Sequence, residues 1–545
     1  MANESWTDSV DEAVNDFFEP VTEFLSEIVF YDVRVFDSDF PLIVGWLVLA
    51  GLVFTAYFGF AQFRYLRTAL KFVSGKYDQK DAPGEISHFQ ALTSAVSGTV
   101  GLGNIAGVAI AVSIGGPGAT FWMILCGLLG MATKFVECTL GVKYREIDAE
   151  GRVSGGPMYY LRKGLAERGL AGLGTVLSFA SALMILFFGF VGGNLFQVNQ
   201  SLEQLNSVTG EHTDFFASSG GSLLFGVVVA VLAGLVIIGG IRSIGQVTSR
   251  LVPSMAIIYV TACLVVIGFN VEQVPDALGT IVSGAFSPEG VTGGVIGALI
   301  QGFRRAAFSN EAGIGSAPIA HSAVKTKRPA SEGLVALLEP FVDTVIICTM
   351  TALTIIIAGG PLYEAARDTA AGGGDPATAE RIAEAGGDPG IAITSDAFDT
   401  ALPWFPWVLT LAVFLFAFST IITWGYYGLK AWTHLFGRSQ TSEYVYKALF
   451  CVITITGALL SLGTLVDLSD CFLFLAAVFN IIGLYLLAPV VKRELNRVLE
   501  YVRRRDAGWT EEQIEEAEAA EAGGSSAVGQ QKHAPSTAPR PTDAS

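Results

Sequence analysis

Glycine interrupts a hydrophobic segment at residues 96–107, within a stretch that carries no charged side chain between Ile86 and Phe121. A stretch this long and apolar belongs in a membrane, yet its glycines favour an unwound backbone over a helix. Unwound backbone at membrane depth is tolerated only where it is buried in protein or lines a wet cavity. The interruption therefore predicts a binding site; the alternative is that the glycines only let helices pack closely.

A second interrupted segment, residues 302–321, weakens the packing alternative. It contains Asn310, Glu311 and Pro318, with glycines between them. A half-helix that starts inside the membrane presents free N–H groups that attract a carboxylate, and one that ends there presents carbonyls. Those carbonyls, with nearby hydroxyls, can ligate sodium. Together the two breaks predict a site for a zwitterionic amino acid and a sodium ion, rather than for a sugar or an anion.

The composition indicates which class of protein contains these two breaks. Of 545 residues, 51% are hydrophobic and only 15% are charged, which is typical of a polytopic membrane protein. The net charge of −17 comes without a basic patch for nucleic acid. The six cysteines lie in hydrophobic segments and are interpreted as buried apolar side chains, not disulfides. Because we find no catalytic triad, phosphate loop or metal cluster, we expect no enzyme and no cofactor.

Hydropathy and the positive-inside rule predict an all-α membrane protein with eleven transmembrane helices. The spans are about 41–63, 88–113, 119–142, 173–200, 222–241, 251–270, 291–320, 333–358, 403–429, 446–464 and 470–490. Basic loops after odd-numbered spans place the N-terminus outside the cell membrane and the C-terminus in the cytoplasm. The breaks fall in spans two and seven, so we predict two five-helix repeats of opposite topology, about 88–270 and 291–490.

The segments outside the transport domain (41–490) have their own character. Residues 1–40 are acidic with apolar residues at helical spacing, which predicts an amphipathic helix on the outer membrane surface. The loop at 361–401 is rich in acids, glycine and alanine. Residues 491–545 form a tail that is first basic and then acidic; a short helix is expected after about 506 and disorder at the end.

Charges inside the membrane need partners. Arg304 and Arg305 precede the second break, and the candidate partners are Glu137, Glu311, Glu339 and Asp343. We favour a structural ion-pair network that holds the breaks over a direct substrate contact. Lys134 and Asp470 lie near predicted span ends and are interpreted as snorkelling side chains. His88 and His321 lie near membrane edges and receive no catalytic role.

Five motifs resemble the alanine/glycine:cation symporter family, also called sodium:alanine symporters. They are Gly-Thr-Val-Gly-Leu-Gly-Asn-Ile-Ala-Gly at 98–107, Gly-Gly-Pro-Gly-Ala-Thr-Phe-Trp-Met at 115–123, Phe-Ser-Asn-Glu-Ala-Gly-Ile-Gly-Ser-Ala-Pro at 308–318, Leu-Glu-Pro-Phe-Val-Asp-Thr at 338–344 and Trp-Gly-Tyr-Tyr-Gly at 424–428. The resemblance covers about 41–490. The family is similar in fold to LeuT-type transporters, whose Val-Gly-Leu-Gly-Asn run matches Val100 to Asn104. Ile124 and Ala306 depart from the family's usual Trp and Gly.

The resemblance implies a sodium-coupled symporter that imports alanine or glycine by alternating access. The substrate-binding residues it implies are Thr99, Gly101, Leu102, Gly103, Asn104, Asn194, Gln197, Phe308, Ser309, Asn310 and Trp424. The implied sodium ligands are Ser97, Val100, Ser419 and Thr420. For Ser419 and Thr420 the alternative is back-bonding to the preceding helical turn; for Asn310 it is a helix cap, a role that can coexist with binding.

Other functions stay open at this point. The same fold could couple to protons, or carry another small zwitterion or an osmolyte. A channel or a substrate-sensing receptor is the rival of a different class. The implied partners are a small neutral amino acid, sodium and the lipid bilayer, with no nucleic acid. The oligomeric state is left open.

Overall fold

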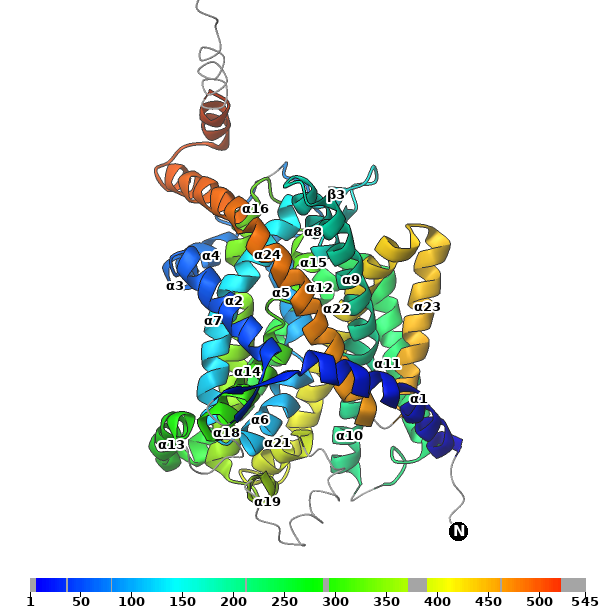
Figure 1. The fold of residues 1–545 in the computed structure, drawn as a ribbon. Helices are drawn as coiled ribbons and strands as arrows, with labels where there is room; N and C mark the ends of the chain where they lie inside the picture. Colours follow the sequence, from blue (N-terminus) through cyan, green and yellow to red (C-terminus); the bar gives the residue numbers. More distant parts are fainter. Residues whose placement is uncertain are drawn as a thin grey trace, which may run out of the picture. The chain divides into compact units, whose positions relative to one another are not determined.

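Helices make up nearly all of the computed structural model, which describes residues 6–35, 38–79, 81–210, 213–287, 294–370, 390–460 and 463–520 (Figure 1). The chain forms two units, 1–492 and 493–545. In order the elements are α1 Trp6–Val29, β1 Asp32–Val35, β2 Ser38–Pro41, α2 Leu42–Tyr57, α3 Ala61–Arg64, α4 Leu66–Val73, α5 His88–Thr99, η1 Leu102–Asn104, α6 Ala106–Ile114, α7 Gly118–Lys143, β3 Glu146–Ile147, β4 Val153–Ser154, α8 Pro157–Ala166, α9 Ala171–Phe190, η2 Val191–Leu195, α10 Phe196–Thr209, α11 Ser219–Ile238, α12 Gly240–Phe269, η3 Val271–Gln273, α13 Val274–Phe286, α14 Gly294–Asn310, α15 Ala317–His321, α16 Pro329–Ala336, α17 Leu338–Pro340, η4 Phe341–Cys348, α18 Thr349–Ala358, α19 Pro361–Ala370, α21 Gly390–Asp399, α22 Phe405–Phe436, α23 Gln440–Gly457 and α24 Gly463–Asp506.

Seven of the described helical stretches are long and apolar enough to cross a membrane, and the bent pair that begins at His88 raises the number to eight. The prediction of an all-α membrane protein is confirmed at this level, whereas the count of eleven stays a prediction. The three further predicted spans are short or polar: α2 has 16 residues, α14 and α15 are separated by the second break, and α23 begins with polar side chains. Two small hairpins, β1–β2 and β3–β4, were not predicted.

Both predicted interruptions are present. α5 ends at Thr99, η1 follows as a single turn, and the chain bends by 65° before it continues as α6. α14 ends at Asn310, and the chain resumes as α15 only at Ala317. Between them Gly313 and Gly315 have φ of +96° and +92°, a conformation that glycine adopts without a Cβ clash. Glycine therefore breaks the second helix as well as the first.

The two broken helices are joined at one end. Ile86, just before α5, pairs with Val324, just after α15, as an isolated parallel bridge. The Arg145 guanidinium donates to four backbone carbonyl oxygens around this bridge, including those of Ser322 at 2.7 Å and Val324 at 2.6 Å. Burial lowers the pKa of Arg145 to about 10. One side chain thus holds together the chain ends that lead into and out of the breaks.

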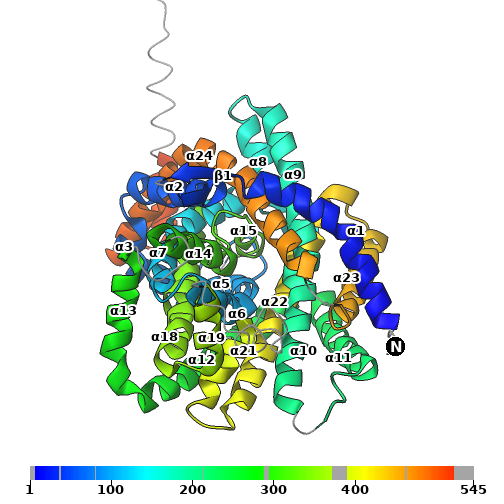
Figure 2. The same ribbon diagram turned by 60° about the horizontal axis from the view of Figure 1, so that its bottom comes forward.

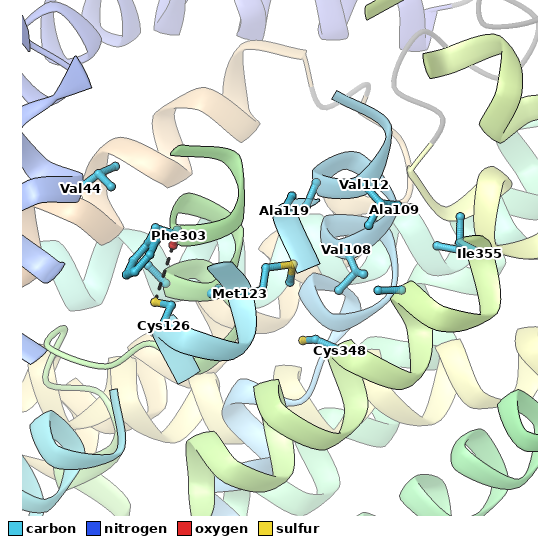
Figure 3. Close-up of a cluster of buried hydrophobic side chains, with 14 of the residues drawn as sticks. Val44, Val108, Ala109, Val112, Ala119, Met123, Cys126, Phe303, Cys348 and Ile355 are labelled. Atoms are coloured by element: carbon cyan, nitrogen blue, oxygen red, sulfur yellow. Dashed lines mark hydrogen bonds between the residues drawn. The ribbon is translucent and has the colours of Figure 1, made fainter. Parts of the chain in front are cut away.

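A buried hydrophobic cluster packs around α6, the half-helix beyond the first break (Figure 3). Val108 and Val112 of α6 face Ala119 and Met123 of α7, and α14 contributes Phe303. Small residues on these helices allow close approach: a Cβ on Gly302 would lie 2.5 Å from the Ala119 carbonyl oxygen. Dense packing on this side holds the α6 half-helix in place next to the break.

The acidic segment at 361–401 is not the continuous loop that composition predicts. Helices α19 and α21 bound it, and Figure 2 shows both beside α6; residues 371–389 lie outside the described part. Ile391, Ile393 and Phe398 of α21 are buried. These apolar residues recur at helical spacing, but the many glycine and acidic residues around them led to the prediction of a loop. Helix α21 covers the first break, because Thr394 Oγ1 contacts the Ile105 carbonyl at 3.5 Å.

The N-terminal segment forms a single helix, α1, that exposes large apolar side chains such as Phe17, Phe24 and Ile28. Its end is anchored by ring contact between Phe30 and Phe474, with centroids 5.5 Å apart. Exposed apolar side chains on a helix are the pattern of an interfacial amphipathic helix, and the position of this segment on the outer membrane surface stays a prediction. The six cysteines are free thiols, which agrees with the prediction of no disulfides. The tail is helical again from 511 to 520, and its predicted disordered end lies outside the described residues.

Candidate functional site

A narrow, partly open cavity lies between the two breaks. Its lining comes from α5 and the first break, the α9–η2–α10 helix, the end of α14 and α22. The lining residues are Gly98, Thr99, Gly101, Gly103, Phe188, Gly192, Gln197, Phe308, Glu311, Thr420 and Trp424. The cavity therefore forms where the sequence places its two interruptions.

Glycine at the first break lets two polar side chains approach the backbone. A Cβ on Gly101 would lie 2.6 Å from Thr420 Oγ1 and 3.2 Å from Gln197 Oε1. Gln197 in turn accepts a hydrogen bond from the Leu102 N–H at 3.3 Å and donates to the Gly192 carbonyl at 3.1 Å. This corner of the cavity is thus neutral and polar. The Leu102 N–H donates to Gln197, and the Gly101 N–H donates to Asn104 Oδ1 at 3.0 Å.

Trp424 forms an apolar wall of the cavity. The side chain is fully buried, and its Nε1 donates to the Gly98 carbonyl at 3.2 Å. Its ring contacts Phe188 edge-on, with centroids 4.6 Å apart. Opposite it, a Cβ on Gly193 would lie 2.4 Å from the indole, so only glycine fits in the π-helical turn η2 at this point. The ring is therefore fixed on both sides, and it limits how large a bound side chain can be.

Oxygen atoms of α5 and α22 converge beside the cavity. The Ser97 carbonyl accepts from Thr420 Oγ1 at 3.2 Å and from Ser419 Oγ at 3.4 Å. Ser97 Oγ donates to the Ser419 carbonyl at 2.7 Å. Both α22 hydroxyls also donate to the Phe416 carbonyl, so the back-bonding alternative is present too. Val100, the fourth implied ligand, is buried at the end of α5.

This oxygen set is neutral, which fits a monovalent cation with oxygen preference better than a transition metal. Consistently, the described residues contain no group of three or more His, Cys, Asp or Glu side chains that could hold a metal ion. A small cavity beside a neutral oxygen cluster is the arrangement that the resemblance implies.

The sequence model of the sodium:alanine symporter family matches residues 23–516. The chain belongs to this family. AgcS, a sodium/alanine symporter of Methanococcus maripaludis, is 37% identical over 86% of this chain and 96% of its own length. GlnT of Bacillus subtilis, a probable sodium/glutamine symporter, is 32% identical over 86% and 89%. Among solved structures, MhsT in complex with L-phenylalanine covers 74% of this chain and 88% of its own, with 14% identity and a TM-score of 0.49, too low a likeness to define the fold.

Family membership confirms that the protein is a symporter and not an enzyme. The predicted site residues of this symporter divide into two groups. Seven line the cavity: Thr99, Gly101, Gly103, Gln197, Phe308, Trp424 and, from the sodium set, Thr420. Gly98, Phe188, Gly192 and Glu311 line it without having been predicted. Gly98 and Glu311 lie in the quoted motifs, whereas Phe188 and Gly192 carry no signal in the sequence.

The remaining predicted residues lie behind the cavity wall. Asn194 donates to the Phe450 carbonyl at 3.1 Å and does not line the cavity. Asn310 donates to Thr344 Oγ1 at 3.1 Å and accepts from the Ala312 N–H at 3.0 Å, so its side chain holds the turn that follows α14. It does not line the cavity, and neither contact caps a helix.

Asp343 connects the two breaks of the symporter. Asn104, from the first break, donates to its carboxylate and, at 3.2 Å, to its backbone carbonyl. Ser309, from the second break, donates to the same carboxylate at 2.8 Å. These contacts correct the interpretation of Asp343 as a partner of Arg304 or Arg305, and they show why Asn104 and Ser309 point away from the cavity. The sequence showed Asp343 as a charged residue inside a span and as part of the motif at 338–344, but not as the link between the breaks.

Two further interpretations of charged residues are wrong. Lys134 does not snorkel, because it pairs with Glu339 at 2.9 Å and both side chains are fully buried. Asp470 does not snorkel either: it pairs with Arg304 at 3.0 Å. Next to the Lys134 pair, Glu332 accepts contacts from the rings of both His88 and His321. These charged side chains are paired within the protein, as expected, but the pairs differ from the predicted ones. The reason is that helix packing brings together residues that are far apart in the sequence.

Proposed function

We propose that this protein imports a small neutral amino acid, alanine or glycine, together with sodium across the cell membrane by alternating access. The observation that carries the proposal is that Thr420 belongs both to the cavity lining and to the oxygen cluster at Ser97. The Thr420 hydroxyl can therefore contact both the amino acid and the sodium ion, which gives a physical basis for coupling their binding. The name of the sodium/alanine relative AgcS supports the same pair of substrates.

The size of the cavity supports a small substrate. It is narrow and bounded by the rings of Trp424, Phe188 and Phe308, and rings of this size leave little space for a long side chain. Alanine or glycine is accordingly favoured over glutamine, the named substrate of the relative GlnT. Uptake of labelled alanine in competition with unlabelled alanine, glycine or glutamine ranks the affinities of the three amino acids.

The decisive experiment is alanine uptake into liposomes that contain the purified protein, with external sodium replaced by choline at fixed pH. We expect uptake to fall to background without sodium. Uptake that persists in choline and follows an imposed pH gradient would instead support proton coupling. Counterflow of labelled alanine separates a carrier from a channel or a receptor, because only a carrier exchanges external label for internal substrate.

The hydroxyls of α22 provide a test of the sodium site. Replacing Ser419 and Thr420 by Ala removes two oxygens that contact the Ser97 carbonyl. The loss of about 1.4 kcal/mol of cation binding corresponds to a tenfold change, so we expect the sodium concentration for half-maximal uptake to rise about tenfold. Thr433→Ala is the control, since this α22 hydroxyl donates to the Lys430 carbonyl at 3.2 Å, away from the site. An unchanged sodium requirement would remove both residues as ligands.

The membrane topology belongs to the same proposal. Alternating access requires two halves that rock about the site, and the breaks in the second and seventh predicted spans support two inverted repeats, about 88–270 and 291–490, in a LeuT-type arrangement. The N-terminus would lie outside and the tail from 491 in the cytoplasm. Labelling of single cysteines placed at residue 17 and in the tail, from each side of the membrane, tests this orientation.

A further inference from the structure

Glu311 is the only ionisable side chain among the described residues that line the cavity. The other lining residues are glycines, aromatic rings, Thr99, Thr420 and Gln197. The side chain of Glu311 is buried, with 3% of its surface exposed. A carboxylate in such a position is costly to bury unless a cationic group meets it or it binds a proton.

The backbone holds Glu311 in an unusual conformation. It has φ of +53°, one of two described residues other than glycine with positive φ, and it follows directly on the end of α14. Ser316 Oγ donates to its Oε2 from the far side of the break. The chain thus accepts backbone strain to keep an acid at this point.

No basic side chain of the described residues lies within ion-pair distance of Glu311. The buried Lys134, whose charge also acts on Glu311, pairs with Glu339 at 2.9 Å. Arg304 on α14 pairs with Asp470. Among the described residues that line the cavity, none therefore supplies a cationic partner for Glu311.

We propose that the Glu311 carboxylate binds the α-ammonium group of the substrate, which rests on the proposed function. The substrate carboxylate lies at the neutral, polar backbone of the first break near Gly103, and Glu311 receives the ammonium at the second break. The charged ends of one zwitterion then connect the two breaks. A charge-assisted hydrogen bond of this kind is about twice as strong as a neutral one.

The proposal makes the amino group a requirement for binding. A 2-hydroxy acid of the same shape, lactate, presents a neutral hydroxyl where alanine presents an ammonium. Purified protein in saturating sodium is titrated calorimetrically with alanine and with lactate. We expect the wild type to bind alanine at least about 100-fold more tightly. Equal affinities in the wild type would overturn the proposal without any variant.

Glu311→Gln keeps the shape of the side chain and removes its charge. We expect the alanine affinity of this variant to fall about 30-fold and its preference for alanine over lactate to fall toward one. Glu311→Asp, which keeps the charge, should retain the preference even if both affinities fall. If Glu311 acted only by holding Ser316, the Glu311→Gln variant would bind alanine and lactate more weakly by the same factor. An unchanged preference for alanine over lactate in this variant would therefore overturn the proposal.

Glu137→Gln is the matched control. Glu137 is equally buried, on α7, accepts from Asn480 at 2.6 Å, and does not line the cavity. It should keep the wild-type preference; loss of the preference in this variant too would attribute the effect to buried charge in general and overturn the assignment. The two proposals can be rejected separately. If the wild type shows no sodium-dependent alanine uptake, the proposed function is wrong. If uptake is normal but Glu311→Gln keeps its preference for alanine over lactate, only the proposed role of Glu311 is wrong.

Discussion

Gly101→Leu is expected to abolish alanine binding while the protein still reaches the membrane. The position has no room for a side chain, because a Cβ alone would lie 2.6 Å from Thr420 Oγ1 and 3.2 Å from Gln197 Oε1. A leucine would extend into the cavity and displace both polar groups that border it. Since the cavity is narrow and bounded by aromatic rings, a leucine side chain takes the space that an amino acid would need. Equilibrium binding of labelled alanine to purified protein measures the effect.

Two further variants separate occlusion of the cavity from loss of folding. Gly268→Leu adds the same side chain to α12, where a Cβ meets nothing within 4 Å, and should bind alanine normally. Gly101→Ala adds only the Cβ and should reduce affinity without abolishing it. If Gly101→Leu elutes as a single species on size exclusion and still binds alanine, the substrate does not occupy this cavity.

Lys134→Ala is expected to cause the largest loss of stability of any single substitution discussed for this protein. Lys134 and Glu339 pair at 2.9 Å with both side chains fully buried. Removing one partner of a buried pair leaves the other charge without compensation, which typically costs about 3–5 kcal/mol. Little mature protein should therefore accumulate in the membrane, and the melting temperature of the purified remainder should fall well below that of the wild type.

Control variants test whether the pair itself is the cause. Lys143→Ala, at the exposed end of the same helix α7, should melt like the wild type. The double variant Lys134→Met with Glu339→Leu removes both charges and keeps the volume, so it should recover much of the lost stability. A Lys134→Ala protein that melts with the wild type would show that the pair contributes nothing to stability.

Much of the architecture was predictable from the sequence because it depends on local rules. Long apolar stretches must be helical in lipid, since backbone groups there find no other partner. Glycine runs at 98–107 and the glycines at 313 and 315 break those helices wherever they occur. Both breaks were predicted at the correct residues for this reason. The helices α19 and α21 were missed, because their burial depends on contact with α6 and not on their own composition.

The sequence by itself determined that the chain is a helical membrane protein with two interrupted helices, and its motifs pointed to the family. Hydropathy and glycine placement act over a few residues, so they can be read along the chain. Only the tertiary structure decided which side chains share a cavity. Glu311 lines the cavity while the neighbouring Asn310 bonds to Thr344 and to the Ala312 N–H, and Lys134 pairs with a residue 205 positions away. Such partners are set by how the helices pack, and no local pattern records that packing.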